Sequence, residues 1–297
     1  MASAKELKDR IKAVEETKKI TGAMYLISST KLRRAKVDLA CSRAYFDALR
    51  GAIAGILCVP PDYKSRYFRR GAAGAGGAAD AGVTGILVVT ADKGLAGAYN
   101  ANVLHAAETL RASTPGARLF VIGEYGRRYF EQHAPEATVY AGGAQTPTPE
   151  NARALGDSLL ARYDAGELNE LYVIYTDMKN GLAAEPRTER LLPLDRGAAG
   201  SGTPQTEFLP SVDEVVRSGV RSYLRGFLYG ALLDSYCAEQ NARVSAMDAA
   251  NRNAQELLEG LSLQLNRQRQ AAITREITEI SAGAQAQKNA GKRKGGV

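Results

Sequence analysis

The residues best suited to chemistry form a glycine-containing loop, DKGLAGAYN, from Asp92 to Asn100, which follows a short apolar run. Glycines at a strand-to-helix turn can present backbone N–H groups to a phosphate. The spacing here is Gly94-x-x-Gly97, which is neither G-x-G-x-x-G nor a loop that ends in G-K-[ST]. We therefore expect a tight turn in which glycine supplies a positive φ, and we keep a nucleotide-dependent enzyme as an alternative.

The histidines and cysteines of the sequence give little evidence of a metal-binding or catalytic site. The two histidines, His105 and His133, have no second ligand at a metal-binding spacing. The cysteines Cys41, Cys58 and Cys237 contain no C-x-x-C pair, and their scatter over helical segments is typical of packing roles in a reducing cytosol. Since no G-x-S-x-G motif or histidine-based triad is present either, the sequence predicts no catalytic residue, no metal ligand and no cofactor.

Positive charge gathers at the N-terminus. The chain has 297 residues and a net charge of +7, and its first 36 residues carry ten basic and four acidic side chains, a surplus of six. Such a segment attracts acidic partners, which can be nucleic acid, anionic lipid or acidic protein loops, unless it is only a solvated face. The N-terminus has no apolar signal core and no window is apolar enough to span a membrane, so neither export nor insertion is predicted.

A coiled-coil seam predicts a long helix in the first part of the chain. The helix should begin near Ser3 and Glu6, which can form a capping box, and end near Leu57, before two prolines. The seam positions alternate steps of four and three, and most of them are apolar. A helix of this length spans roughly 75 Å and needs a partner helix of similar length. The seam consists of Leu7, Ile11, Val14, Lys18, Thr21, Tyr25, Ser28, Leu32, Ala35, Leu39, Ser42, Phe46, Leu49, Ile53 and Ile56.

The partner lies at the other end of the chain, where a helical pattern runs from about Ser211 to about Ala284. Because the chain leaves and re-enters the helical part on either side of an inserted segment, we expect the two helices to pair antiparallel. Residues 285–297 are a basic polar tail that we expect to be disordered. The second seam consists of Val244, Met247, Asn251, Ala254, Leu258, Leu261, Leu265, Gln268 and Ala272.

The middle of the chain has a different periodicity. Short apolar runs at Gly85–Thr90, Arg118–Gly123 and Glu170–Thr176 alternate with helical stretches near 101–113, 124–133 and 150–165, which is typical of a parallel α/β sheet. Ala183–Leu194 can add a further strand. The predicted fold is an antiparallel coiled coil of N- and C-terminal helices with an inserted Rossmann-like parallel α/β domain. The segments are a helix over 1–58, an α/β domain over 83–195, a helix over 211–285, connectors over 59–82 and 196–210, and a tail over 286–297.

Three sequence blocks closely resemble the γ subunit of F-type ATP synthases. They are AKELKDRIKAVEETKKITGAMYLISSTKLRRAK at the start, the loop DKGLAGAYN, and EQNARVSAMDAANRN followed by RQAAITREITEISAGA near the end. They occur in the family's order and at matching separations over nearly the whole chain. Together they are far more specific than the glycine loop alone.

The resemblance implies a central rotor shaft that transmits ion-driven rotation of the c ring to the catalytic hexamer of α and β subunits. In that family ATP is made or hydrolysed on β, so the chain itself would not be an enzyme. The implied partners are the α and β subunits, the ε subunit and the c ring. The implied location is peripheral, on the cytoplasmic face of a bacterial cell membrane. A nucleic-acid-binding coiled-coil protein is the alternative that the basic first helix keeps open.

The resemblance also implies roles for individual residues, although simple packing remains an alternative for each. Met24 matches the family's coupling methionine, and Glu207 and Phe208 lie near the segment that would meet the c ring or ε. Gly22 stands where the family often has lysine, at a cost of about 1 kcal/mol relative to alanine in a helix. Residues 195–206 lack the cysteine pair of the chloroplast thiol switch. The coupling residues expected in the C-terminal helix are Arg243, Gln270, Thr274, Glu276 and Glu279.

Overall fold

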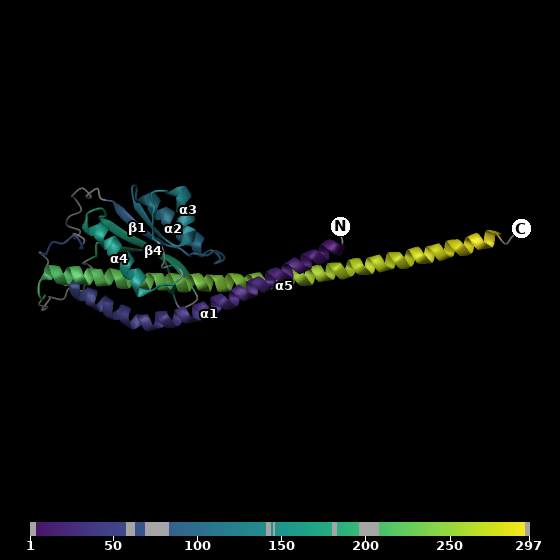
Figure 1. The fold of residues 1–297 in the computed structure, drawn as a ribbon, viewed down its shortest axis with the longest axis horizontal. Coiled ribbons are helices and arrows are strands. Elements are labelled where there is room, and N and C mark those ends of the chain that lie inside the picture. Colours follow the sequence, from purple (N-terminus) through teal and green to yellow (C-terminus); the bar gives the residue numbers. More distant parts are fainter. Residues whose placement is uncertain are drawn as a thin grey trace. The chain divides into compact units, whose positions relative to one another are not determined.

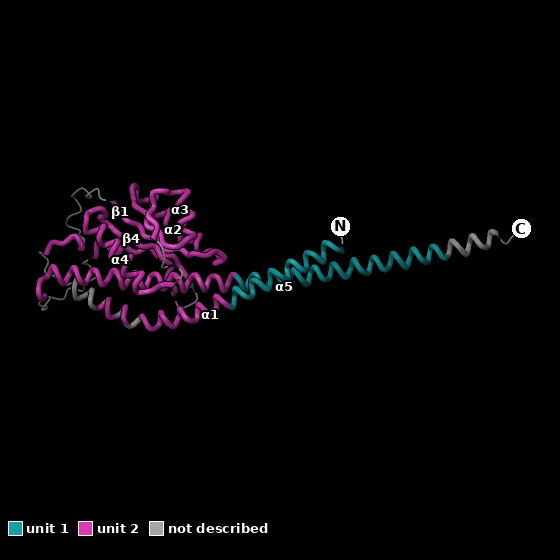
Figure 2. Tube along the Cα trace, in the orientation of Figure 1, with its two compact units in different colours: residues 1–26, 247–297 teal, residues 27–246 magenta. Residues whose placement is uncertain are grey.

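The computed structural model describes residues 4–57, 63–68, 83–140, 144, 146–179, 183–195 and 208–294. These residues form two compact units, one made of residues 27–246 and the other of residues 1–26 with 247–297 (Figure 2). Two long helices, α1 (Ala4–Leu57) and α5 (Val212–Lys294), contribute to both units. Ser3 of the proposed capping box and the prolines after the first helix lie outside the described residues, as do residues 69–82 of the first connector.

The larger unit contains a five-stranded sheet with the order β3-β2-β1-β4-β5. All neighbouring strands are parallel except β4 and β5, which are antiparallel because only three residues separate them. The predicted strands and the predicted α/β insertion are therefore confirmed, but the sheet is mixed and contains one strand that the sequence did not predict, β3. The strands are β1 (Thr84–Val89), β2 (Arg118–Ile122), β3 (Thr138–Tyr140), β4 (Glu170–Lys179) and β5 (Ala183–Leu192).

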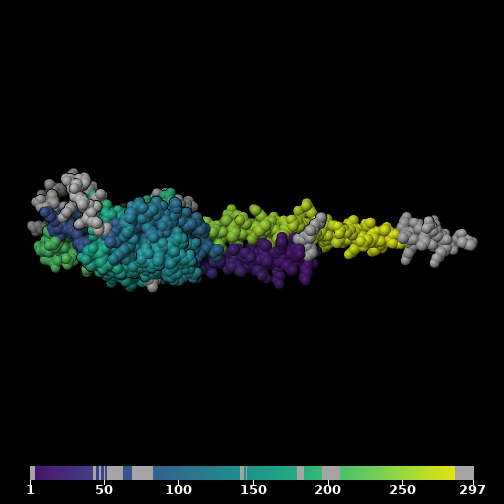
Figure 3. Space-filling model, turned by 90° about the horizontal axis from the view of Figure 1, so that it is seen from above, coloured from purple at the N-terminus to yellow at the C-terminus, as the bar shows by residue number. Residues whose placement is uncertain are grey.

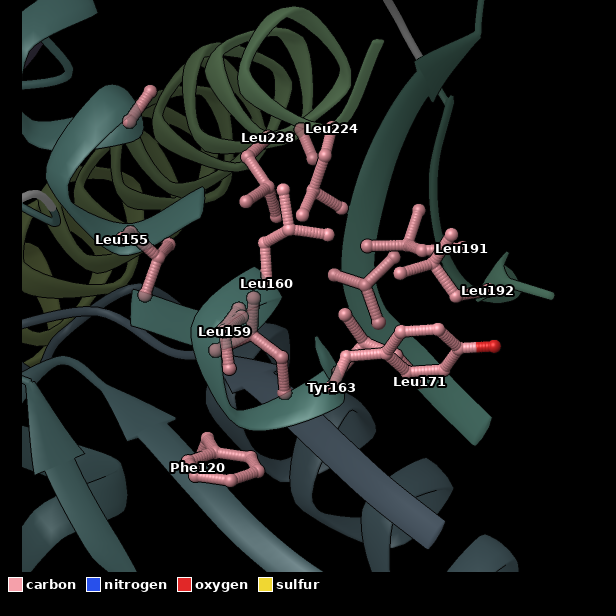
Figure 4. Packing of buried hydrophobic residues seen from close by; sticks show 14 of the residues in the cluster. Phe120, Leu155, Leu159, Leu160, Tyr163, Leu171, Leu191, Leu192, Leu224 and Leu228 are labelled. Carbon is pink, nitrogen blue, oxygen red and sulfur yellow. The ribbon is translucent and has the colours of Figure 1, made fainter. Parts of the chain in front are cut away.

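Helices cover both faces of this sheet, which explains why its inner strands are apolar without alternation. Helices α2 (Tyr99–Ser113) and α3 (Glu124–His133) pack on one face (Figure 1). Ile86 and Val88 of β1 belong to the core cluster on this face. Helix α4 (Pro149–Asp164) and the first part of α5 pack on the other face. Leucines of α4, α5, β4 and β5 interlock there around Phe120 and Tyr163 (Figure 4).

Part of the first connector also packs onto the larger unit. The Arg66 guanidinium lies 4.7 Å from the centre of the Tyr163 ring and donates to the backbone oxygen of Asp164 (2.9 Å). Phe68 forms a parallel bridge with Leu194, just beyond β5. This segment, expected only as a connector, therefore extends the core at the edge of the sheet.

In the larger unit, α1 and α5 approach closely where α5 has glycine. A Cβ atom on Gly226 would lie 2.3 Å from Leu49 Cδ2, and one on Gly230 would lie 3.0 Å from the Phe46 ring. Because higher numbers in α1 meet lower numbers in α5, the helices run antiparallel, as predicted. Along α1, every predicted seam position from Leu7 to Leu49 is buried or half-buried, which confirms the heptad register.

The smaller unit is a helix pair with polar contacts inside its seam. The Thr21 hydroxyl donates to Asn251 Oδ1 (2.5 Å), and Lys18 Nζ donates to Gln255 Oε1 (2.6 Å). Figure 3 shows the purple N-terminal residues of α1 beside α5, and the yellow end of α5 continuing past them without a neighbouring helix. All side chains from 269 to 284 are exposed, so the prediction that Ala272 is a seam position was wrong.

The basic tail also differs from the expectation, because α5 continues as helix to Lys294. Alanine, glutamine and lysine, which make up much of this stretch, favour helix wherever the chain does not turn. Among the described residues, no helix combines the length and the apolar character needed to cross a membrane.

Candidate functional site

The loop after β1 is a tight structural turn. Gly97 has φ +55°, as the sequence predicted for a glycine of this loop. The backbone N–H of Ala91 donates to Asn100 Oδ1 (3.0 Å), and the backbone N–H of Glu124 donates to Asp92 Oδ1 (2.9 Å). The Asp92 carboxylate thus occupies the N-terminus of α3, a position that in other sheets of this kind is open to phosphate.

Arg243 holds the same loop from the side of α5. Its Nη2 donates to the backbone oxygens of Lys93 (2.9 Å) and Gly94 (3.0 Å), and its Nε donates to Gly94 (3.2 Å). Its Nη1 forms an ion pair with Glu239 Oε1 at 2.7 Å. Both side chains of this pair are only 7% exposed, so the guanidinium group is directed into the protein rather than toward solvent.

A polar network surrounds this ion pair between α5, α2 and β4. Burial raises the pKa of Glu239, and Asp92 raises it further, whereas Arg243 and Lys31 lower it. Burial also raises the pKa of Tyr99, and the Glu239 carboxylate adds to that shift. The network therefore favours an un-ionised phenol beside a carboxylate whose charge depends on its arginine partner.

The other coupling residues that the resemblance implied in α5 lie together on its bare end. Gln270, Thr274, Glu276 and Glu279 are all exposed, and the Thr274 hydroxyl donates to the backbone oxygen of Gln270 (2.9 Å). Three isoleucines lie in the same stretch and are 47%, 62% and 73% exposed. This segment, residues 269–284, is named the α5 end here. The exposed isoleucines are Ile273, Ile277 and Ile280.

On α1, Met24 is half-buried, while Ile20 and Leu26 are 61% and 65% exposed. Nine of the ten basic side chains within residues 1–36 are exposed, and the tenth is Lys18, which bonds to α5. This part of α1 therefore presents apolar and basic groups together. Such a surface suits acidic protein loops better than it suits a nucleic-acid backbone, which makes no use of apolar side chains.

The structure places the implied residues in different environments. Gln270, Thr274, Glu276 and Glu279 share the α5 end, while Arg243 belongs to the core of the larger unit.

Phe208 is partly buried and packs against the core between the sheet and helices α4 and α5, and Glu207 lies outside the described residues.

Sequence reasoning missed Glu239, although its spacing of four residues before Arg243 is the usual signal of a helical ion pair. Among the described residues, no cluster of three or more histidine, cysteine or acidic side chains could hold a metal ion.

Comparisons with known proteins agree over most of the chain. A protein-family model described as ATP synthase matches residues 3–287. The ATP synthase gamma chain of Ruminiclostridium cellulolyticum is 37% identical, and the match covers 95% of this chain and 98% of that protein. The ATP synthase gamma chain of Caldanaerobacter subterraneus subsp. tengcongensis is 38% identical, with 93% and 97% covered.

Solved structures show the same fold at lower identity. A chain from the Euglena gracilis mitochondrial ATP synthase, in a structure described as OSCP/F1/c-ring, gives a TM-score of 0.69 at 15% identity. That match covers 97% of this chain and 95% of the Euglena chain. A chain from the central stalk and c-ring of the Tetrahymena thermophila enzyme gives a TM-score of 0.57 at 19% identity, with 78% and 99% covered.

Proposed function

The chain belongs to the ATP synthase gamma chain family, and we propose that it transmits ion-driven rotation of a c ring to a catalytic hexamer of α and β subunits. It is a non-catalytic gamma subunit of the central stalk. The bare α5 end is the observation that carries the proposal. A helix that exposes three isoleucines over four turns needs a protein partner, because large apolar groups in one row are unfavourable in water.

The two paired helices expose different side chains. The surface that a surrounding subunit meets would therefore change as the pair rotates. The N-terminal part of α1 exposes lysines and arginines, whereas the stretch of α5 that pairs with it exposes Leu257, Glu259 and Leu263. A surrounding ring of three identical catalytic sites would therefore meet a different surface at each site. Only contacts that differ between two states can shift the equilibrium between those states, so the angle of the shaft would set the nucleotide affinity of each site.

The proposed division of the chain follows its sequence segments. Residues 1–58 and 211–285 form the shaft that contacts α and β, through Met24, Gln270, Thr274, Glu276 and Glu279. The α/β domain over 83–195 contacts the ε subunit and the c ring, with Glu207 and Phe208 near that contact. The subunit associates with the membrane through its complex, and its proposed location is the cytoplasmic face of a bacterial cell membrane. No nucleic acid, metal or cofactor is part of the proposal.

Reconstitution tests this function. The isolated chain should hydrolyse no ATP, and mixing it with α and β subunits of the same enzyme should yield a complex that co-purifies and hydrolyses ATP. In vesicles that contain the whole enzyme, hydrolysis should drive proton uptake. A variant that ends at Gln268 is the matched control, because it keeps the paired part of both helices and loses the α5 end. A chain that binds no α–β assembly would refute the proposal.

Met24→Lys tests coupling more specifically. The side chain is half-buried beside seam position Tyr25 on a helix that is already basic. A further cation there would strengthen attraction to acidic loops of the surrounding subunits at one angle of the shaft and so hinder rotation. We expect complexes to assemble normally while the protons pumped per ATP hydrolysed fall severalfold. Ala23→Lys, at the exposed neighbouring position, is the control, and an unchanged ratio in Met24→Lys would contradict the expectation.

A further inference from the structure

We propose that Arg243 is a positioning residue, which fixes the turn from Lys93 to Ala96 on α5 and affects coupling through that turn rather than by touching another subunit. This inference rests on the proposed coupling function. It departs from what the resemblance implies, namely that Arg243 belongs with the contact residues of the shaft.

The guanidinium group of Arg243 is committed to partners inside the chain. Three of its hydrogen bonds reach the backbone oxygens of Lys93 and Gly94, and its remaining described contact is the ion pair with Glu239. The residue is 6% exposed. Another subunit could reach this group only after these contacts break, and a buried carboxylate would then lose its cation.

The turn that Arg243 holds has a backbone that needs support. Leu95 has φ +61°, a left-handed conformation that residues other than glycine, asparagine and aspartate seldom adopt. Its side chain is 61% exposed, whereas Ala96 beside it is 2% exposed and packs beneath the turn. The result is an outward-facing leucine and lysine on a backbone that is fixed from below.

Arginine is the residue suited to this task. The planar guanidinium donates from three separate nitrogens, so it can reach two neighbouring carbonyl oxygens and a carboxylate at once, whereas the three N–H donors of lysine all radiate from one nitrogen. The carboxylate of Glu239 also receives a hydrogen bond from Gln240 Nε2 (3.3 Å). The clamp is thus anchored on α5 at both charged groups, and any movement of α5 at this level carries the turn with it.

Hydrogen exchange of the full-length chain tests the clamp without any partner subunit. Arg243→Met removes the fork, and Arg243→Met with Glu239→Gln removes it without leaving a lone buried carboxylate. Arg252→Met is the matched control, since Arg252 lies on the same helix and its side chain is 74% exposed. We expect the amides of residues 93–98 to exchange about tenfold faster or more in both Arg243 variants, while β1 amides and the control stay unchanged.

The assembled enzyme supplies the second readout. Both Arg243 variants should pump fewer protons per ATP hydrolysed, by similar factors, and Arg243→Lys should not rescue the ratio. Unchanged exchange in residues 93–98 combined with lost coupling would overturn the inference in favour of a direct contact. Faster exchange with normal coupling would overturn it as well, because the turn would then have no role in transmission. Should even the unaltered chain fail to assemble, the proposed function fails, and the exchange result alone still tests the clamp.

Discussion

The two described cysteines on the long helices differ in solvent exposure. Cys237 is fully buried beside Ala35 and Met178, and burial raises the pKa of its thiol to about 12, with Asp234 adding to the shift. Cys41 is exposed on α1. The nucleophile in thiol chemistry is the thiolate, so these two residues should react very differently.

Alkylation checks this difference. With a pKa near 12, only roughly one Cys237 thiol in ten thousand is ionised at pH 8. Iodoacetamide should therefore modify Cys41 and spare Cys237 in the folded chain, as read by mass spectrometry of the peptides, and should modify both in urea. Since the pKa of the folded thiol lies above its ordinary value of 9.0, stability should decline as the pH rises from that value toward 12. Equal modification of both cysteines in the folded chain would contradict the expectation.

Two glycines with opposite surroundings give a second test at this scale. A Cβ atom added to Gly22 in α1 meets nothing within 4 Å, so Gly22→Ala should stabilise the helix by about 1 kcal/mol. A Cβ atom on Gly126 would lie 2.6 Å from Thr90 Oγ1 and 2.8 Å from Val121 Cγ1, so Gly126→Ala should destabilise by about 1–3 kcal/mol. Thermal unfolding of the full chain measures both. If both variants changed the unfolding temperature in the same direction, the space around these glycines would not determine the effect on stability.

At the scale of elements, the sequence predicted those features that repeat along the chain. The heptad seam was found because burial alternates by three and four over many turns, and the strands were found because burial on both faces makes them continuously apolar. Ala272 was misplaced because the pattern of α5 continues beyond the last residue that α1 can cover. The strand β3 has only three residues, which is too short to produce a recognisable pattern.

The residues of the candidate site could likewise be predicted from the sequence only in part. Exposure of Gln270, Thr274, Glu276 and Glu279 could be expected because polar side chains on a helix usually face solvent. The position of Arg243 could not, because its backbone partners lie 149 and 150 residues away and carbonyl oxygens carry no sequence signature. Glu239 alone was detectable, by its helical spacing from Arg243.

The polar contact in the seam of the smaller unit leads to a prediction about the helix pair. Asn251 is half-buried and accepts from the Thr21 hydroxyl, which can also donate to the backbone oxygens of Thr17 (3.2 Å) and Lys18 (3.1 Å). Asn251→Leu would add buried apolar area without stranding that hydroxyl. We expect a gain of about 1 kcal/mol in the free energy of unfolding, at the expense of a contact that specifies register.

Urea unfolding followed by circular dichroism measures the gain. Asn253→Leu is the control, because Asn253 lies two residues away on the exposed side of α5 and makes the same chemical change without burial. If Asn251→Leu is no more stable than the control, the polar pair of Thr21 and Asn251 does not lower the free energy of unfolding.

For the whole molecule, the main consequence is that part of α5 has no stabilising neighbour among the residues that the structure describes. Isolated helices of this length are marginal in water, and no side chain between 269 and 284 is buried. We expect amides of 272–284 to exchange within seconds in the isolated chain, while those near Met247 and Ala254, which are buried, stay protected. Assembly with α and β subunits should slow exchange in 272–284 by orders of magnitude.

Equal protection of both regions in the isolated chain would show that the α5 end needs no partner. Protection that stays low after assembly would show that α and β do not cover it. The amides of β1 serve as an internal reference in both measurements, because that strand is buried throughout.

The antiparallel pairing has a further consequence for how the chain is made. Thr21 meets Asn251, 230 residues later, so a ribosome adding 5–20 residues per second needs roughly ten to fifty seconds between the two. During that interval the nascent first helix displays an unfilled apolar seam, which another newly made copy could occupy instead. The sheet domain that is synthesised in between can fold first and join Ala35 to Cys237, which shortens the remaining search. The order of synthesis therefore leaves the seam of α1 unpaired until the second helix has been made.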